Sequence, residues 1–81
     1  MNNTDRDAAK KLGQFIIAAR KQRNMTRAEL IRRTGLALSV TQRIEQGNAN
    51  PTLGTLKKLT TALGFRLCIH PDGPPFTYLL T

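Results

Sequence analysis

Three glycines divide the middle of this chain into short helical segments, and this spacing constrains the fold more than any other feature. Gly35, Gly47 and Gly64 each follow a run in which apolar residues recur with helical spacing. Glycine readily adopts the left-handed backbone conformation that ends a helix. We therefore predict four helices with short connections, over about residues 5–23, 27–34, 38–46 and 53–63.

Polar residues at the predicted helix ends support this division. Asn24 tolerates the left-handed conformation and so suits the end of the first helix. Thr26 and Glu29 have the spacing of a capping box, in which each side chain accepts a hydrogen bond from the other residue's amide. Thr52 is placed to cap the fourth helix in the same way as Thr26 caps the second.

The third helix has few apolar residues to bury. Val40 and Ile44 lie four positions apart, which places them on one helix face. We expect these two to form the inward stripe, supported by Thr41 or Leu36. A buried Thr41 hydroxyl would need a backbone acceptor, because burying a polar group without a hydrogen bond is costly.

The apolar pattern changes after the fourth helix. Phe65, Leu67 and Ile69 alternate with more polar residues, which predicts a strand over residues 65–70. The Pro- and Gly-rich stretch 71–75 then forms a turn or a rigid linker. The sequence thus predicts a helical domain over residues 5–64 and a separate segment over residues 65–81.

A single strand leaves its backbone hydrogen-bonding groups unpaired. Residues 76–80 can fold back as a second strand, although Pro74 and Pro75 disfavour a tight two-residue turn. Alternatively, strand 65–70 pairs with its copy in a second subunit around a two-fold axis. We favour this second solution, which predicts a homodimer. Its interface residues are Phe65, Leu67 and Ile69.

The charge of the chain narrows the kind of partner. Its 81 residues include 13 Lys and Arg against 5 Asp and Glu, a formal net charge of +8. Such a balance favours a polyanionic partner, either nucleic acid or an acidic membrane surface. No apolar stretch approaches the roughly 18–20 residues that span a bilayer. We therefore expect a cytoplasmic protein that does not enter the membrane.

Few residues are suited to catalysis or metal binding. The chain has one His and one Cys, which excludes an internal disulfide and a Cys/His zinc site. Cys68 and His70 lie on one face of the predicted strand, but two ligands are too few for a metal centre. Ser39 and Cys68 have no base–orienter pair that would activate a nucleophile. We predict neither enzymatic activity nor a cofactor.

The two helices around Gly35 are joined by a tight turn, as in a helix-turn-helix. Several blocks occur in register: Leu12-x3-Ile16-x3-Arg20, Met25-Thr26-x2-Glu29-Leu30, Thr34-Gly35-Leu36, Arg43-Ile44-Glu45-x-Gly47 and Pro51-Thr52-Leu53. Over about residues 10–64 the chain therefore resembles the Xre/Cro-type helix-turn-helix family, which includes phage repressors and many bacterial antitoxins. The resemblance implies a mainly α fold of four to five helices that binds double-stranded operator DNA as a sequence-specific repressor.

The resemblance also implies roles for individual residues. The outward face of the third helix reads base edges in the major groove. The residues of this face are Leu38, Ser39, Gln42 and Arg43. Phosphate contacts fall to Arg27, Asn48, Asn50 and Thr52, with Arg23, Lys57 and Lys58 as looser candidates. Arg20 pairs with Glu45 in a largely buried ion pair, which offsets the unfavourable position of an acid near a helix C-terminus.

Two positions depart from the family pattern. Ala37 stands where the family usually has a capping Ser or Thr, and Leu38 stands where a polar base-reading side chain is common. Loss of the cap lowers stability by about 0.5–2 kcal/mol. Leu38 can still contact a thymine methyl group, but it cannot form a hydrogen bond with a base.

Residues 63–71 resemble the end of small HipB-like antitoxins, in which a C-terminal strand completes a sheet between subunits. This second resemblance implies an antitoxin that represses its own operon and binds a kinase-like HipA-type toxin. The alternative is a stand-alone or phage-type regulator with no toxin partner. Near the end of the chain, four large apolar residues either bind a partner or cover the dimer sheet: Phe76, Tyr78, Leu79 and Leu80.

Overall fold

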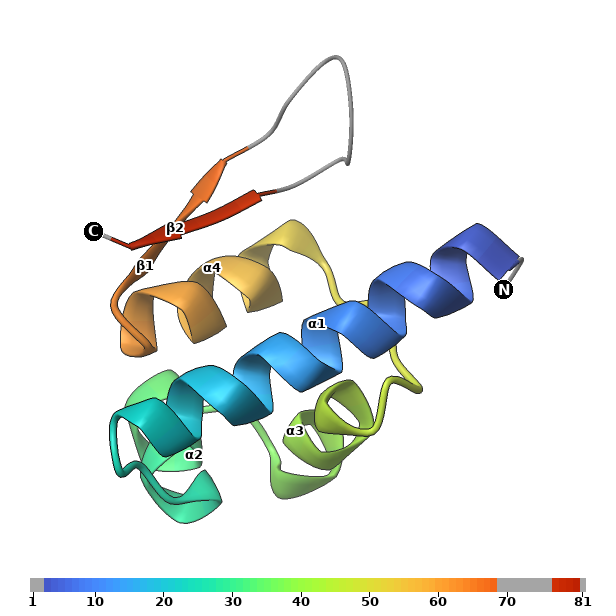
Figure 1. The fold of residues 1–81 in the computed structure, drawn as a ribbon. Helices are drawn as coiled ribbons and strands as arrows, with labels where there is room; N and C mark the ends of the chain where they lie inside the picture. The colour runs from blue at the N-terminus through green and yellow to red at the C-terminus, as the bar shows by residue number, and fades with distance from the viewer. Residues whose placement is uncertain (1–2, 69–76, 81) are drawn as a thin grey trace.

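The fold is mainly α, and the described residues form four helices and two C-terminal strands (Figure 1). A computed structural model describes residues 3–68 and 77–80, with side-chain detail over residues 6–67. The predicted fold class is confirmed. The elements are α1 (Asn3–Gln22), α2 (Arg27–Thr34), α3 (Leu38–Glu45), α4 (Leu53–Ala62), β1 (Phe65–Cys68) and β2 (Thr77–Leu80).

The helix ends follow the chemistry predicted for them. Asn24 has a positive φ of 51° after α1, and Gly35 closes α2 with a φ of 73° and an amide that donates to the Ile31 carbonyl. The Thr26 hydroxyl accepts from the Glu29 amide at 3.1 Å. The other half of the predicted capping box is wrong, because the Glu29 carboxylate binds Arg32 and Arg33 instead.

The inward face of α3 differs from the prediction. Its buried residues are Thr41, Ile44 and Glu45, whereas Val40 is 38% exposed. The stripe is centred one position further along the helix, so Val40 lies at its margin. The buried Thr41 hydroxyl donates to the Ala37 carbonyl at 3.2 Å, which supplies the backbone acceptor that a buried hydroxyl requires.

Helix α1 crosses the middle of the molecule, with α4 and the hairpin on one side and α2 and α3 on the other in the view of Figure 1. Every helix contributes to one apolar core. Its fully buried apolar side chains are Ile16, Leu30, Ile44, Leu56, Leu59 and Leu63. Helices α2 and α3 are therefore fixed to α1 by shared core packing, which positions the surface that α3 presents.

Strand β1 pairs antiparallel with β2 of the same chain, in a register that runs from Phe65 opposite Leu80 to Cys68 opposite Thr77. The favoured prediction, pairing with a second subunit, is therefore not the pairing observed for β1. Residues 69–76 separate the two strands. The connection is therefore longer than the two-residue turn that Pro74 and Pro75 disfavour.

The side chains of β1 pack on the chain's own helices. The ring of Phe65 lies edge-on to that of Phe15, with centroids 4.8 Å apart, and the Arg23 guanidinium lies 4.5 Å from its centroid. Leu67 packs against the same core. Phe65 and Leu67 thus pack on the helices of their own chain, and their predicted role in a dimer interface stays a prediction. The predictions for Ile69, His70 and Phe76 lie outside the described residues.

Candidate nucleic-acid interface

Helix α3 presents an outward face that the fold leaves free. Leu38 is 52% exposed, Ser39 and Arg43 are also exposed, and Gln42 is half-buried. Within the described part of the chain, the polar side chains of Ser39, Gln42 and Arg43 form no hydrogen bond or ion pair. The four residues predicted to read bases therefore lie together on one accessible surface of one helix.

The N-terminal end of α3 lacks a side-chain cap. Ala37 has the extended backbone of an N-cap residue, with φ −68° and ψ 150°, but no side-chain hydrogen bond. The first amides of the helix are left for solvent or a ligand. This end of α3 carries Leu38 and Ser39, so the least constrained part of the helix also carries two of the predicted base-reading residues.

The opposite end of α3 is held by ionic contacts. Glu45, the last residue of the helix, has a side chain only 1% exposed. Its Oε2 accepts from Arg20 Nε at 3.0 Å, and its Oε1 accepts from Arg27 Nε at 3.0 Å and lies 2.9 Å from Arg27 Nη2. Arg20 also donates from Nη1 to the Met25 carbonyl at 3.0 Å. We call these three charged residues the Glu45 cluster, and they tie α3 to both α1 and α2.

The second arginine of this cluster was predicted for a different role. Arg27 is predicted from the sequence to contact a DNA phosphate, and Arg20 is the single partner predicted for Glu45. In the structure Arg27 binds Glu45 while remaining 40% exposed. The crossing of α2 over α3 brings the two residues together, and spacing along the chain does not reveal that crossing. One signal was available, because an acid at a helix C-terminus needs compensating positive charge.

Two glycines allow α1 to approach the C-terminal end of α3. A Cβ atom on Gly13 would lie 2.6 Å from the carbonyl oxygens of both Ile44 and Glu45. A Cβ on Gly47 would lie 3.0 Å from the Cα of Lys10, and Gly47 also has a positive φ of 76°. Gly47 is predicted from the sequence to end a helix, whereas no role is predicted for Gly13. The signal for Gly13 is a glycine inside a helix, which usually has a packing reason.

The remaining residues predicted to contact phosphates differ in their surroundings. Asn48 and Asn50 are exposed in the loop that follows α3. Thr52 is exposed too, but its hydroxyl caps α4 by accepting from the Thr55 amide at 3.2 Å. Arg23 lies against Phe65 and donates to the Ala19 carbonyl, so it is part of the hairpin packing and is not directed toward α3.

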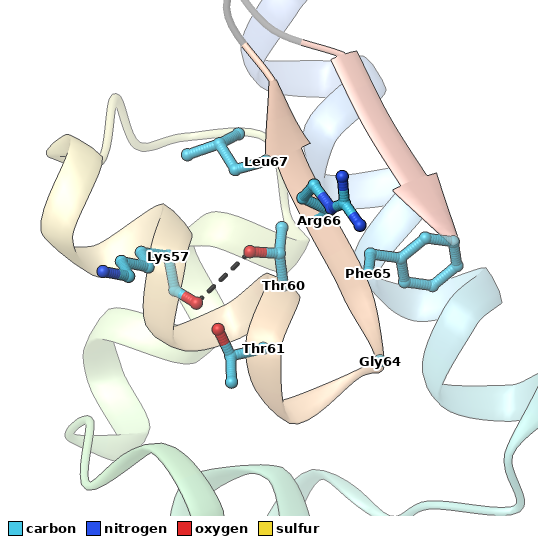
Figure 2. A pocket seen from close by; sticks show the side chains of 7 residues that line it. All are labelled: Lys57, Thr60, Thr61, Gly64, Phe65, Arg66 and Leu67. Carbon is cyan, nitrogen blue, oxygen red and sulfur yellow. Dashed lines mark hydrogen bonds between the residues drawn. The ribbon is translucent and has the colours of Figure 1, made fainter. Parts of the chain in front are cut away.

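A surface hollow elsewhere on the molecule contains none of the predicted DNA-contacting residues except the looser candidate Lys57. It lies between α4 and β1 (Figure 2). Its lining residues are Lys57, Thr60, Thr61, Gly64, Phe65, Arg66 and Leu67. No group of three or more His, Cys, Asp or Glu residues that could hold a metal occurs among the residues described. No helix in the same part of the chain combines the length and hydrophobicity that a membrane crossing requires.

Comparisons with known proteins bear on this geometry. Residues 16–69 match the family described as Helix-turn-helix. The matched segment includes α2, the turn, α3 and α4. The chain is 38% identical over 56 residues to the immunity repressor protein of Bacillus phage phi105, and the alignment covers 69% of this chain and 39% of that relative. The chain thus spans well under half the length of the phage protein. No solved structure gave a significant match.

Proposed function

The chain belongs to the Xre/Cro-type helix-turn-helix family, and we propose that it is a DNA-binding transcriptional repressor with no enzymatic activity. One observation carries the proposal. Helix α3 is fixed to the core through Ile44 and Glu45, while Ser39 and Arg43 on its other face are exposed and have no polar partner among the described residues. A helix held in this way suits the major groove of B-DNA, where each base pair presents a distinct pattern of donors and acceptors.

Each exposed side chain of α3 suits a particular contact. Arg43 can donate two hydrogen bonds to guanine O6 and N7, which is the commonest specific contact in such interfaces. Gln42 can bind adenine or a phosphate, and Ser39 can bind a base or a backbone oxygen. Leu38 offers an apolar surface to a thymine methyl group. Arg27, Asn48 and Asn50 would contact phosphates, and these contacts position the protein without specifying sequence.

The relative favours a phage-type regulator over an antitoxin. The similar protein of Bacillus phage phi105 is an immunity repressor. Neither comparison supports a HipA-type toxin as a partner, and part of the segment that resembles HipB-like antitoxins, residues 69–71, lies outside the described residues. We therefore propose a regulator that acts on an operator without a toxin partner, which was the alternative in the sequence analysis.

A selection experiment tests the proposal. The full chain would be used to enrich binding sites from a library of random duplexes, and the affinity of the selected operator would be compared with that of a scrambled duplex. Arg43→Ala should reduce discrimination by about 5- to 150-fold, the loss expected for one bidentate base contact. Gln46→Ala is the matched control, because Gln46 is exposed just beyond the end of α3. Failure to enrich any sequence would contradict specific DNA binding.

We also propose that two copies bind one operator, as helix-turn-helix repressors commonly bind two half-sites about one helical turn apart. A dimer with about six to ten phosphate contacts would lose roughly 10³- to 10⁵-fold in affinity between 50 and 200 mM salt. Sedimentation of the chain with and without the selected duplex would give the stoichiometry. One chain per duplex at saturation would exclude the dimer.

A further inference from the structure

Glu45 divides its carboxylate between two arginines that differ in exposure. The side chain of Arg20 is 13% exposed and is further fixed by its bond to the Met25 carbonyl. The side chain of Arg27 is 40% exposed. The inner arginine therefore completes the core, and the outer one lies at the surface at the start of α2.

The cluster has an uncompensated charge at that surface. Two guanidinium groups and one carboxylate leave a formal charge of +1. Arg27 uses Nε and Nη2 on Glu45 Oε1, and its Nη1 has no partner among the described residues. A guanidinium has five N–H donors in a rigid fork, so it can bind a carboxylate on one edge and a phosphate on another. A DNA phosphate would neutralise the remaining charge.

We propose that Glu45 is a positioning residue that holds the Arg27 guanidinium in place for a phosphate of the DNA backbone. The inference rests on the proposed DNA-binding function and goes beyond it. Glu45 is the last residue of α3 and Arg27 is the first residue of α2. One carboxylate therefore links a phosphate contact directly to the helix that reads bases. Contact at Arg27 then sets the depth and angle at which α3 enters the groove.

The test uses the full chain and two duplexes, the operator selected above and a scrambled duplex of the same composition. Arg27→Gln should lower the slope of log affinity against log salt by about 0.9 per chain, since one phosphate contact is lost. Its affinity for the operator should fall roughly tenfold or more. Arg32→Gln is the matched control, because it removes the same charge from an exposed position on the same helix and should change both quantities less.

Arg27→Lys separates positioning from charge. A lysine keeps the positive charge but is a point charge without the fork. It should restore the salt slope on the scrambled duplex while leaving the operator affinity reduced. The proposal is overturned if Arg27→Gln behaves like Arg32→Gln, or if Arg27→Lys restores wild-type operator affinity. Either result would leave DNA binding by the wild-type chain intact, so it is distinguishable from failure of the proposed function.

Glu45→Gln gives a further readout. It removes the charge that holds Arg27 and raises the net charge by one, so binding to the scrambled duplex should be unchanged or stronger. Binding to the operator should weaken roughly tenfold. Circular dichroism would first establish that this variant is folded at the temperature used. If this variant is unfolded, the Arg27 variants test the proposal instead, because Arg27→Gln leaves the buried contact between Arg20 and Glu45 in place. Unchanged operator affinity in folded Glu45→Gln would overturn the proposal.

Discussion

Two carboxylates in this molecule each bind two arginines, but the two groups of ion pairs differ in which parts of the fold they connect. Glu29 binds Arg32 and Arg33, three and four residues further along the same helix. We call this group the Glu29 cluster, and its arginine side chains are well exposed. Glu45 binds Arg20 and Arg27, which lie 25 and 18 positions away in sequence and belong to two other helices.

The difference between the clusters lies in what the ion pairs hold together. The Glu29 cluster joins residues that α2 alone already brings close, so it adds little to the fold and is screened by salt. The Glu45 cluster joins three helices around a carboxylate that is almost fully buried. Breaking it leaves a buried charge without its partner, which is far more costly than breaking an exposed pair. Identical residue types therefore have unequal effects on stability.

The largest expected effect compares the two clusters directly. Arg20→Ala should lower the free energy of unfolding by about 3 kcal/mol, the low end for breaking a buried pair, because Arg27 still contacts Glu45. Arg32→Ala should produce no resolvable change, since its partner Glu29 remains solvated and keeps Arg33. Urea unfolding followed by circular dichroism measures both. Equal losses in the two variants would mean that burial does not separate the clusters.

A smaller loss is expected where α1 meets the end of α3 beside the Glu45 cluster. Gly13→Ala places a methyl group 2.6 Å from two backbone carbonyl oxygens, and the shift this requires should cost about 1–3 kcal/mol. Gly54→Ala is the matched control. Its Cβ would meet only the Thr52 hydroxyl, at 3.9 Å, so helix propensity should stabilise the protein by about 0.5–1 kcal/mol. Thermal unfolding should show changes of opposite sign, and changes of the same sign would contradict the close approach.

The Glu45 cluster fixes only one end of α3, and the other end offers a stabilising change. Ala37→Ser supplies the missing cap at a residue whose backbone already has N-cap geometry. It should raise the free energy of unfolding by about 0.5–2 kcal/mol. Ala28→Ser is the control, because Thr26 already caps α2. Absence of any gain from Ala37→Ser, measured by urea unfolding, would indicate that the first turn of α3 needs no cap.

The smallest expected effect is a pH dependence from the Glu29 cluster. The hydrogen bond from Arg33 is the main cause that holds the pKa of Glu29 below its ordinary value of 4.5, with Arg32 contributing and burial opposing the shift. A carboxyl whose folded pKa is lowered contributes stability above its unfolded pKa. That contribution is lost as the pH falls below 4.5 and through the lower folded pKa. Glu29→Gln should therefore flatten the dependence of Tm on pH in this range, and an unchanged profile would argue against the shift.

The clusters also show what the sequence could predict. Contacts between residues close in sequence can be predicted from residue type and spacing. The helix ends at Asn24 and Gly35 and the Thr26 cap were therefore predicted correctly. The exposed position of Val40 was missed because a four-residue spacing defines a helix face only to within one position. The second partner of Glu45 and the close approach at Gly13 depend on helix crossings, which spacing alone does not give. The pairing of β1 with β2 is not the favoured prediction, because Pro74 and Pro75 disfavour a tight turn, whereas residues 69–76 separate the two strands.

The side chains of Ser39, Gln42 and Arg43 have no polar partner in the part of the chain that the structure describes, and this has an evolutionary consequence. Under the proposed function, such substitutions would change which operator is bound without removing any hydrogen bond or ion pair that the described fold contains. New target sequences are then within reach of single substitutions that leave the internal contacts of the fold in place. A substitution at Glu45 instead breaks ion pairs to two other helices, α1 and α2. Under the proposed function, the DNA sequence that is bound can thus change while the Glu45 cluster stays the same.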